Sequence, residues 1–185
     1  MTTEARFKLA LREMMLTKPL SDINVTTLCE KLNCHRQTFY YHYQDIYDLL
    51  ASIFLNEEVP GLSKAGDIEE TLKCLLEYAI KNFGFLRSSY LSAGSDLVND
   101  FFYNKIITKM VAMYSPHSGT GITKANYRNV ARRFANNVSQ EFGFLFKSQD
   151  MTATKLDRAL RRYISAAVTV LYPSFLVLAK EEKKR

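Results

Sequence analysis

The sequence has 185 residues, of which 47% are hydrophobic and 24% are charged, and its formal net charge is +6. This composition excludes a disordered chain, and the seven glycines and four prolines exclude a collagen-like or low-complexity one. Three cysteines, an odd number in a chain of this length, argue against a disulfide framework and favour a reducing compartment. We therefore expect a globular, cytoplasmic protein, and the modest basic surplus alone does not identify its partners.

The predicted secondary structure is helical from the N-terminus onward. Phe7, Ala10, Leu11 and Met14 recur at the spacing of one helix face. No later stretch alternates between apolar and polar residues for long enough to require a strand, and no Asn-Gly or Asp-Gly hairpin signal is present. The chain is therefore predicted to be all-α.

A helix-turn-helix is predicted directly after the first helix. Asn24 is a suitable N-cap for a short helix over 25–32, and Asn33 suits the left-handed position that follows such a helix. A second short helix, about 36–43, begins after only three residues. In a helix-turn-helix this second helix enters the major groove of DNA.

The first residues of that second helix have the side chains that read base edges. Arginine bonds guanine bidentately, glutamine does the same with adenine, and threonine offers a hydroxyl or a methyl group. These residues are Arg36, Gln37 and Thr38. Tyr40, Tyr41 and His42 suit phosphate contacts or packing, whereas Phe39 is better explained as a core residue.

Residues 4–55 resemble the DNA-binding domain of the TetR family of bacterial transcriptional regulators. The most specific match is the run Thr-Phe-Tyr-Tyr-His-Tyr at 38–43, and the longer run RQTFYYHYQDIYDLL is similar to the dihydroxyacetone-kinase operon regulators within that family. The resemblance implies a three-helix DNA-binding domain over 1–48 and a helical regulatory and dimerisation bundle over 49–185. It also implies a set of DNA-facing residues: Thr26, Arg36, Gln37, Thr38, Tyr40, Tyr41 and His42.

One departure from the family pattern concerns phosphate binding. Ile46 stands where many relatives carry a lysine near a phosphate, at the start of the fourth helix. The absence of that lysine is expected to weaken nonspecific affinity for DNA, although the backbone N–H groups at the N-terminus of the fourth helix offer another phosphate site. Residues 1–50 carry six basic and six acidic side chains, so we expect a shallow salt dependence of DNA binding.

The central segment carries the basic surplus and many aromatic residues. No acidic residue lies between Asp100 and Glu141, and the role of the basic residues over 105–133 stays unassigned. The aromatic residues are better explained as core than as an effector pocket. Because no polar side chains visibly cluster in this segment, no ligand residue is named. The aromatic residues are Tyr78, Phe83, Phe85, Tyr90, Phe101, Phe102 and Tyr103.

Two long helices are predicted at the C-terminal end, over 123–147 and 154–180. The stretch 163–179 has no charge, but it is short for a membrane span and contains polar residues, so we expect no membrane insertion. Pro173 is expected to kink the last helix or to begin a separate segment. By resemblance to the family, the last two helices pair with those of a second copy, which gives a homodimer.

The sequence contains no catalytic motif and no complete metal-ligand pattern. Cys29, Cys34 and His35 have no second ligand pair nearby, and Cys29 falls on the buried helix face. We therefore predict no enzyme activity, no metal and no cofactor. The predicted function is a homodimeric regulator of the TetR type that binds a palindromic operator in double-stranded DNA under control of an unidentified effector. The alternatives are an adaptor whose bundle binds a partner protein and, least favoured, an all-α enzyme.

Overall fold

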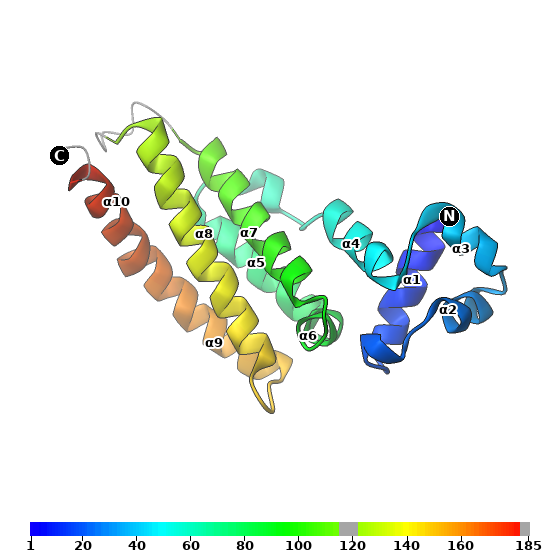
Figure 1. Ribbon diagram of the computed structural model, residues 1–185. Coiled ribbons are helices and arrows are strands. Elements are labelled where there is room, and N and C mark those ends of the chain that lie inside the picture. The colour runs from blue at the N-terminus through cyan, green and yellow to red at the C-terminus, as the bar shows by residue number, and fades with distance from the viewer. Residues whose placement is uncertain (115–121, 182–185) are drawn as a thin grey trace. The chain divides into compact units, whose positions relative to one another are not determined.

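The computed structural model describes residues 1–114 and 122–181, and this part of the chain is helical with no strand (Figure 1). The prediction of an all-α chain is therefore confirmed. In chain order the α-helices are α1 (Thr3–Met15), α2 (Val25–Leu32), α3 (Arg36–His42), α4 (Ile46–Asn56), α5 (Ile68–Lys81), α6 (Phe83–Tyr90), α7 (Ser95–Ala112), α8 (Lys124–Lys147), α9 (Ala153–Ala166) and α10 (Tyr172–Glu181).

Contacts within the chain divide it into two compact units. The first comprises Met1–Glu58 and Asn82–Val98, and the second comprises Val59–Lys81 and Asn99–Arg185. From the sequence, DNA binding is instead assigned to residues 1–48 and regulation to residues 49–185, and that assignment of roles stays a prediction.

The first unit is built around α1. Phe7, Ala10 and Leu11 are buried as predicted, but the next buried residue is Met15 rather than the half-buried Met14. Met15 lies one turn after Leu11, so the buried face continues along the i, i+4 row. Helix α6 also packs on α1. There the Arg12 guanidinium lies 4.4 Å from the centre of the Phe85 ring and pairs with Glu57.

The second unit has α8 at its centre. Val130, Phe134, Val138 and Phe142 form a buried stripe along this helix, and Phe102 of α7 meets Phe142 with their ring centres 4.6 Å apart. α8 also packs against α9 and α10, and α9 packs against α5. The prediction that the central aromatic residues are core is confirmed for the five that are buried: Tyr78, Phe85, Tyr90, Phe101 and Phe102. Phe83 and Tyr103 are half-buried.

The last helical run changes its hydrogen-bonding pattern before Pro173. α9 ends at Ala166, a π-helical turn follows over Ala167–Leu171, and α10 begins with Pro173 as its second residue. Proline lacks an N–H group to donate and is tolerated in a first helical turn. The sequence predicted a kink or a separate segment at Pro173; the structure has a change of hydrogen-bonding pattern just before it, and the helical run continues into α10.

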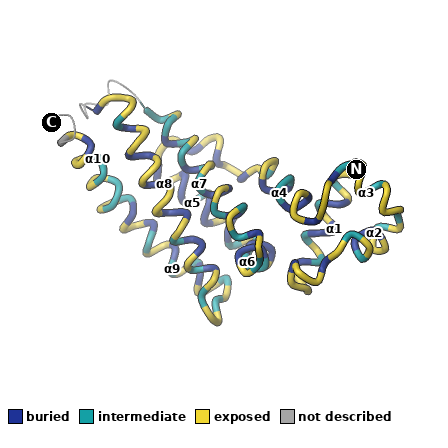
Figure 2. Tube along the Cα trace, in the orientation of Figure 1, coloured by how far each residue is buried: buried dark blue, intermediate teal, exposed yellow. Residues whose placement is uncertain are grey.

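The run formed by α9 and α10 is poorly covered within the chain. Among the described residues, Ala153–Lys180 is the one helical run that is long and apolar enough to cross a membrane, by length and composition only. In its most apolar stretch of 18 residues, 17% of the residues are buried. Figure 2 shows mostly exposed and half-buried residues along it. A single helix of this kind is weak evidence for a membrane span.

Candidate DNA-binding site

Helix α2 is fixed at both ends by asparagines. At its start the side-chain carbonyl oxygen of Asn24 accepts from the Thr27 N–H (2.9 Å), and the Thr27 hydroxyl accepts from the Asn24 N–H (3.3 Å), which makes a capping box. At its end Asn33 adopts the left-handed conformation, with φ 50° and ψ 55°. Both predicted roles are confirmed, and together they fix the tight turn into α3.

Helix α3 is held against α1 by aromatic packing. Phe39 is fully buried, and its ring centre lies 5.3 Å from that of Phe7 and 5.7 Å from that of Tyr43. The Phe7–Phe39 pair is edge-to-face, and such pairs favour one relative orientation of the rings. Because Phe39 points inward, residues on the other side of α3 face away from α1. The prediction that Phe39 belongs to the core is confirmed.

The seven predicted DNA-facing residues do not share one degree of exposure. Arg36, Gln37, Tyr40 and Tyr41 on α3 are exposed, and so is Thr26 on α2. Tyr41 is the more exposed of the two tyrosines, at 85% against 51% for Tyr40. Thr38 and His42 are half-buried. The exposed side chains supply a guanidinium, an amide and three hydroxyl groups, which suit phosphate and base-edge contacts.

His42 has a contact that the sequence pattern did not suggest. Its Nδ1 lies 3.4 Å from Oε1 of Glu4 on α1, and its ring packs edge-on against Tyr41, with the centres 5.0 Å apart. This side chain therefore joins the last turn of α3 to the first turn of α1. A role for it in DNA binding stays a prediction.

The start of α4 is capped by two aspartates. The Asp45 carboxylate accepts from the Asp48 N–H (2.8 Å), and the Asp48 carboxylate accepts from the Gln44 N–H (2.9 Å). The Asp48 N–H belongs to the first turn of α4, the Gln44 N–H lies just before the helix, and the two carboxylates add negative charge at this terminus. Ile46, the residue in place of the family lysine, is buried. A phosphate site at this helix terminus stays a prediction.

The cysteine in α2 is a packing residue. Cys29 is 3% exposed, and burial, helped by the neighbouring Cys34, raises the pKa of its thiol to about 11. A thiol with so high a pKa stays protonated at neutral pH. The described part of the chain has no group of three or more His, Cys, Asp or Glu side chains placed to hold a metal ion.

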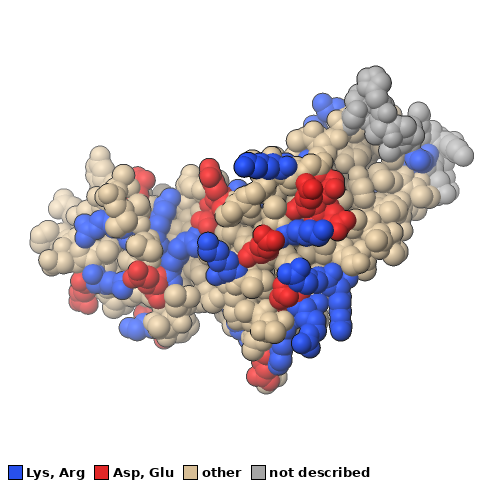
Figure 3. All heavy atoms as spheres, turned by 180° about the vertical axis from the view of Figure 1, so that it is seen from behind, with Lys and Arg blue, Asp and Glu red and all other residues tan. Residues whose placement is uncertain are grey.

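Charge on the surface is mixed in sign. On the face shown in Figure 3, Lys and Arg side chains lie interspersed with Asp and Glu, and basic side chains also gather on part of it. On α2, Lys31 is paired with Glu13 at 3.0 Å, and the Arg6 guanidinium donates to the Leu32 carbonyl oxygen (3.0 Å). Both cations near the turn are therefore engaged within the chain, which leaves Arg36 as the exposed cation at the start of α3.

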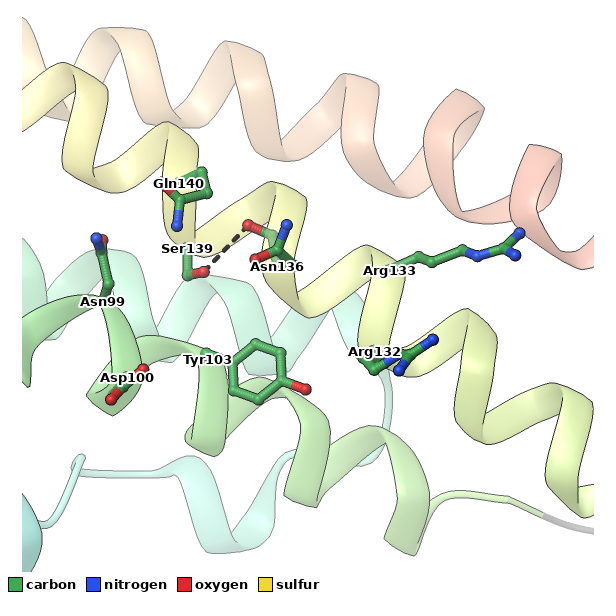
Figure 4. Close-up of a pocket in the computed structure, with 8 residues that line it drawn as sticks. All are labelled: Asn99, Asp100, Tyr103, Arg132, Arg133, Asn136, Ser139 and Gln140. Atoms are coloured by element: carbon green, nitrogen blue, oxygen red, sulfur yellow. Dashed lines mark hydrogen bonds between the residues drawn. The ribbon is translucent and has the colours of Figure 1, made fainter. Parts of the chain in front are cut away.

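A polar cleft in the second unit corrects one expectation from the sequence. Polar side chains of the central segment do gather, in a cleft of about 390 Å³ between α7 and α8 (Figure 4). The α7 and α8 residues of the cleft lie 29 to 41 positions apart in the sequence, and only the pairing of the two helices brings them together. They include Asn99, Asp100 and Tyr103 from α7 and Arg132, Asn136 and Gln140 from α8.

Comparison with known proteins supports the fold. No family model and no curated protein sequence matches the chain. Among solved structures, the chain is similar to one named dihydroxyacetone kinase operon activator DhaS, with a TM-score of 0.62 and 19% sequence identity over 96% of each chain. At this identity the likeness concerns the fold, and it extends over both units. The chain therefore has an all-helical fold like that of this solved structure, which is named as an operon activator.

Proposed function

We propose that this protein is a transcriptional regulator of the TetR type that binds a palindromic operator as a homodimer. The observation that carries the proposal is the presentation of α3. Its inward residue Phe39 is locked against α1, and Arg36, Gln37, Tyr40 and Tyr41 are exposed on the same short helix. The name of the structural neighbour, an operon activator, supports a role in transcription.

In this proposal the side chains of α3 divide into two groups. Arg36, Gln37 and Thr38 lie at its start, where a recognition helix meets base edges. Thr26, Tyr40, Tyr41 and His42 supply hydroxyl and imidazole groups to phosphates. The base contacts set the sequence preference, and the phosphate contacts set the orientation of the helix.

The proposed dimer forms through α8 and the run of α9 and α10. Val170, Val177 and Leu178 are large apolar side chains on this run that stay 46–63% exposed within one chain. Exposing such a continuous apolar face to water is unfavourable in free energy. In a two-fold dimer the same face of a second copy covers it. Two copies then place two α3 helices so that each reads one half of a palindrome.

Control by an effector would act as a shift between two arrangements of the dimer. A ligand bound to the second unit stabilises the arrangement that it binds more tightly. If DNA binds the two arrangements with different affinity, the ligand changes the affinity for DNA, and DNA changes the affinity for the ligand by the same factor. The α7–α8 cleft weakens the main reason for the adaptor alternative, which was the lack of a polar cluster in the sequence.

The direct test is a selection of DNA fragments by the purified protein, starting with the region upstream of its own gene. We expect enriched fragments to share a palindrome whose half-sites are centred about 34 Å, or a multiple of it, apart. Recovery of fragments without any shared two-fold sequence would contradict the proposal.

A further inference from the structure

The turn between α2 and α3 brings two cysteines together. The Cys34 N–H donates to the Cys29 carbonyl oxygen (3.0 Å), and the Asn33 N–H donates to the Glu30 carbonyl oxygen (3.1 Å). With Asn33 in the left-handed conformation, these two bonds make a Schellman motif, whose first and last residues frequently have their side chains in apolar contact. Here both of those side chains carry a thiol.

The two thiols differ in their access to solvent. Cys29 is 3% exposed, and its S–H group donates to the His35 carbonyl oxygen (3.9 Å). Cys34 is half-buried, and both cysteines line a cleft of about 460 Å³ beside the turn. The thiols lie within hydrogen-bonding reach of each other, and this contact adds to the effect of burial in raising the pKa of Cys29. A small reagent can therefore reach Cys34 first, with the Cys29 thiol next to it.

We propose that Cys29 and Cys34 form a reversible disulfide when the protein meets a small disulfide such as oxidised glutathione. The bond closes a loop with only four residues between the cysteines, and the Schellman hydrogen bonds already hold the backbone of that loop. In a reducing compartment, disulfides of this kind are transient and serve redox sensing or catalysis. The modification requires no DNA. Its consequence for α3, a covalent link across the turn that positions this helix, rests on the proposed function.

The reaction is an exchange in two steps. Cys34 loses its proton to water, and its thiolate attacks one sulfur of oxidised glutathione, whose S–S bond breaks and releases one glutathione thiolate. Cys29 then loses its proton and attacks the Cys34 sulfur, so the mixed S–S bond breaks and the second glutathione thiolate leaves. Both leaving thiolates take up a proton. Two protein thiols are oxidised to one disulfide, and one glutathione disulfide is reduced to two thiols.

Tryptic peptides distinguish the three cysteines of the chain. Cleavage after Lys31 places Cys29 in peptide 13–31 and Cys34 in peptide 32–36, and Cys74 lies in peptide 74–81. The full-length protein is incubated with oxidised glutathione at pH 8, its remaining thiols are blocked with iodoacetamide, and the digest is analysed by mass spectrometry without reduction. We expect peptides 13–31 and 32–36 to be joined, and the intact monomer to lose the mass of two hydrogen atoms. No joined pair, or an equal yield of pairs that include Cys74, would overturn the proposal.

The equilibrium constant for the exchange tests whether the fold prepares the pair. It is measured in buffers of oxidised and reduced glutathione, once for the folded protein and once in concentrated urea. Because the folded turn already holds the two thiols together, the constant should be roughly tenfold or more larger for the folded protein. Equal constants would refute a site prepared by the Schellman motif.

Two variants test the role of each thiol. Cys29→Ser lacks the second thiol, so Cys34 should stay as a mixed disulfide with glutathione. Cys74→Ser is the matched control, because Cys74 lies on α5 outside the motif, and it should leave the Cys29–Cys34 bond unchanged. The same amount of mixed disulfide in the wild type and in Cys29→Ser would show that Cys34 reacts alone and would refute the proposal. Failure of the reduced protein to bind any operator would refute the proposed function and leave this inference standing.

Discussion

Replacing Val170 and Val177 with aspartate is expected to dissociate the proposed dimer. Within one chain these side chains are 63% and 55% exposed. Full burial of a valine side chain contributes about 1.5 kcal/mol, so covering the exposed part contributes roughly 1 kcal/mol each. Because a two-fold interface contains every residue twice, the pair accounts for about 4 kcal/mol per dimer, which is roughly a thousandfold in the dimer Kd.

Sedimentation equilibrium of the two proteins over a range of concentrations measures this change. The thousandfold weakening is a lower bound, because each aspartate also places a charge in an apolar contact. Leu55→Asp is the matched control, since Leu55 is a large apolar residue at 83% exposure outside the α9–α10 run. An unchanged dimer Kd in the double variant, or the same weakening in the control, would refute the assignment of the interface.

Three further predictions concern the DNA-binding unit. Asn24→Ala removes the N-cap of α2 and should lower the free energy of unfolding by about 1 kcal/mol in urea titrations, and a change below a few tenths would mean that the capping box contributes nothing. Cys29 should react with iodoacetamide much more slowly than Cys34 at pH 8, and its rate should rise as the pH approaches 11, because burial raises the pKa of its thiol and the thiolate is the reactive form. Mass spectrometry of the two cysteine-containing peptides measures both rates. Equal rates at pH 8 would contradict the burial of Cys29. Operator affinity should depend weakly on salt, and a slope that corresponds to roughly ten or more released counterions per dimer would show that another, more basic face binds DNA.

Local rules predicted the parts of the fold that depend on neighbouring residues. Asn24 and Asn33 stand at helix ends for reasons of capping and left-handed geometry, and both lie there in the structure. Pro173 lies in the first turn of α10, where the missing N–H donor of proline is tolerated. These features need only a few consecutive residues, so the sequence alone determined them.

Features that depend on the pairing of distant segments were not predictable in the same way. The residues of the α7–α8 cleft gather only once the two helices pack, and no spacing in the sequence indicated it. The pairing of His42 with Glu4 likewise depends on how α3 rests on α1. At the start of α4, the bonds from the Asp48 N–H to Asp45 and from the Gln44 N–H to Asp48 were not predicted either.

The most direct test of the central claim is the affinity of the selected operator for the Arg36→Ala and Arg128→Ala variants, measured by fluorescence anisotropy at one fixed salt concentration. Both substitutions remove one exposed arginine, but only Arg36 lies at the start of α3. Losing a bidentate contact to guanine costs about 1–3 kcal/mol, so Arg36→Ala should weaken binding about 5- to 150-fold and relax the preference for one base pair in each half-site. Arg128→Ala should leave affinity and sequence preference unchanged. Equal affinities of the two variants for the operator would contradict the assignment of α3 as the element that reads DNA.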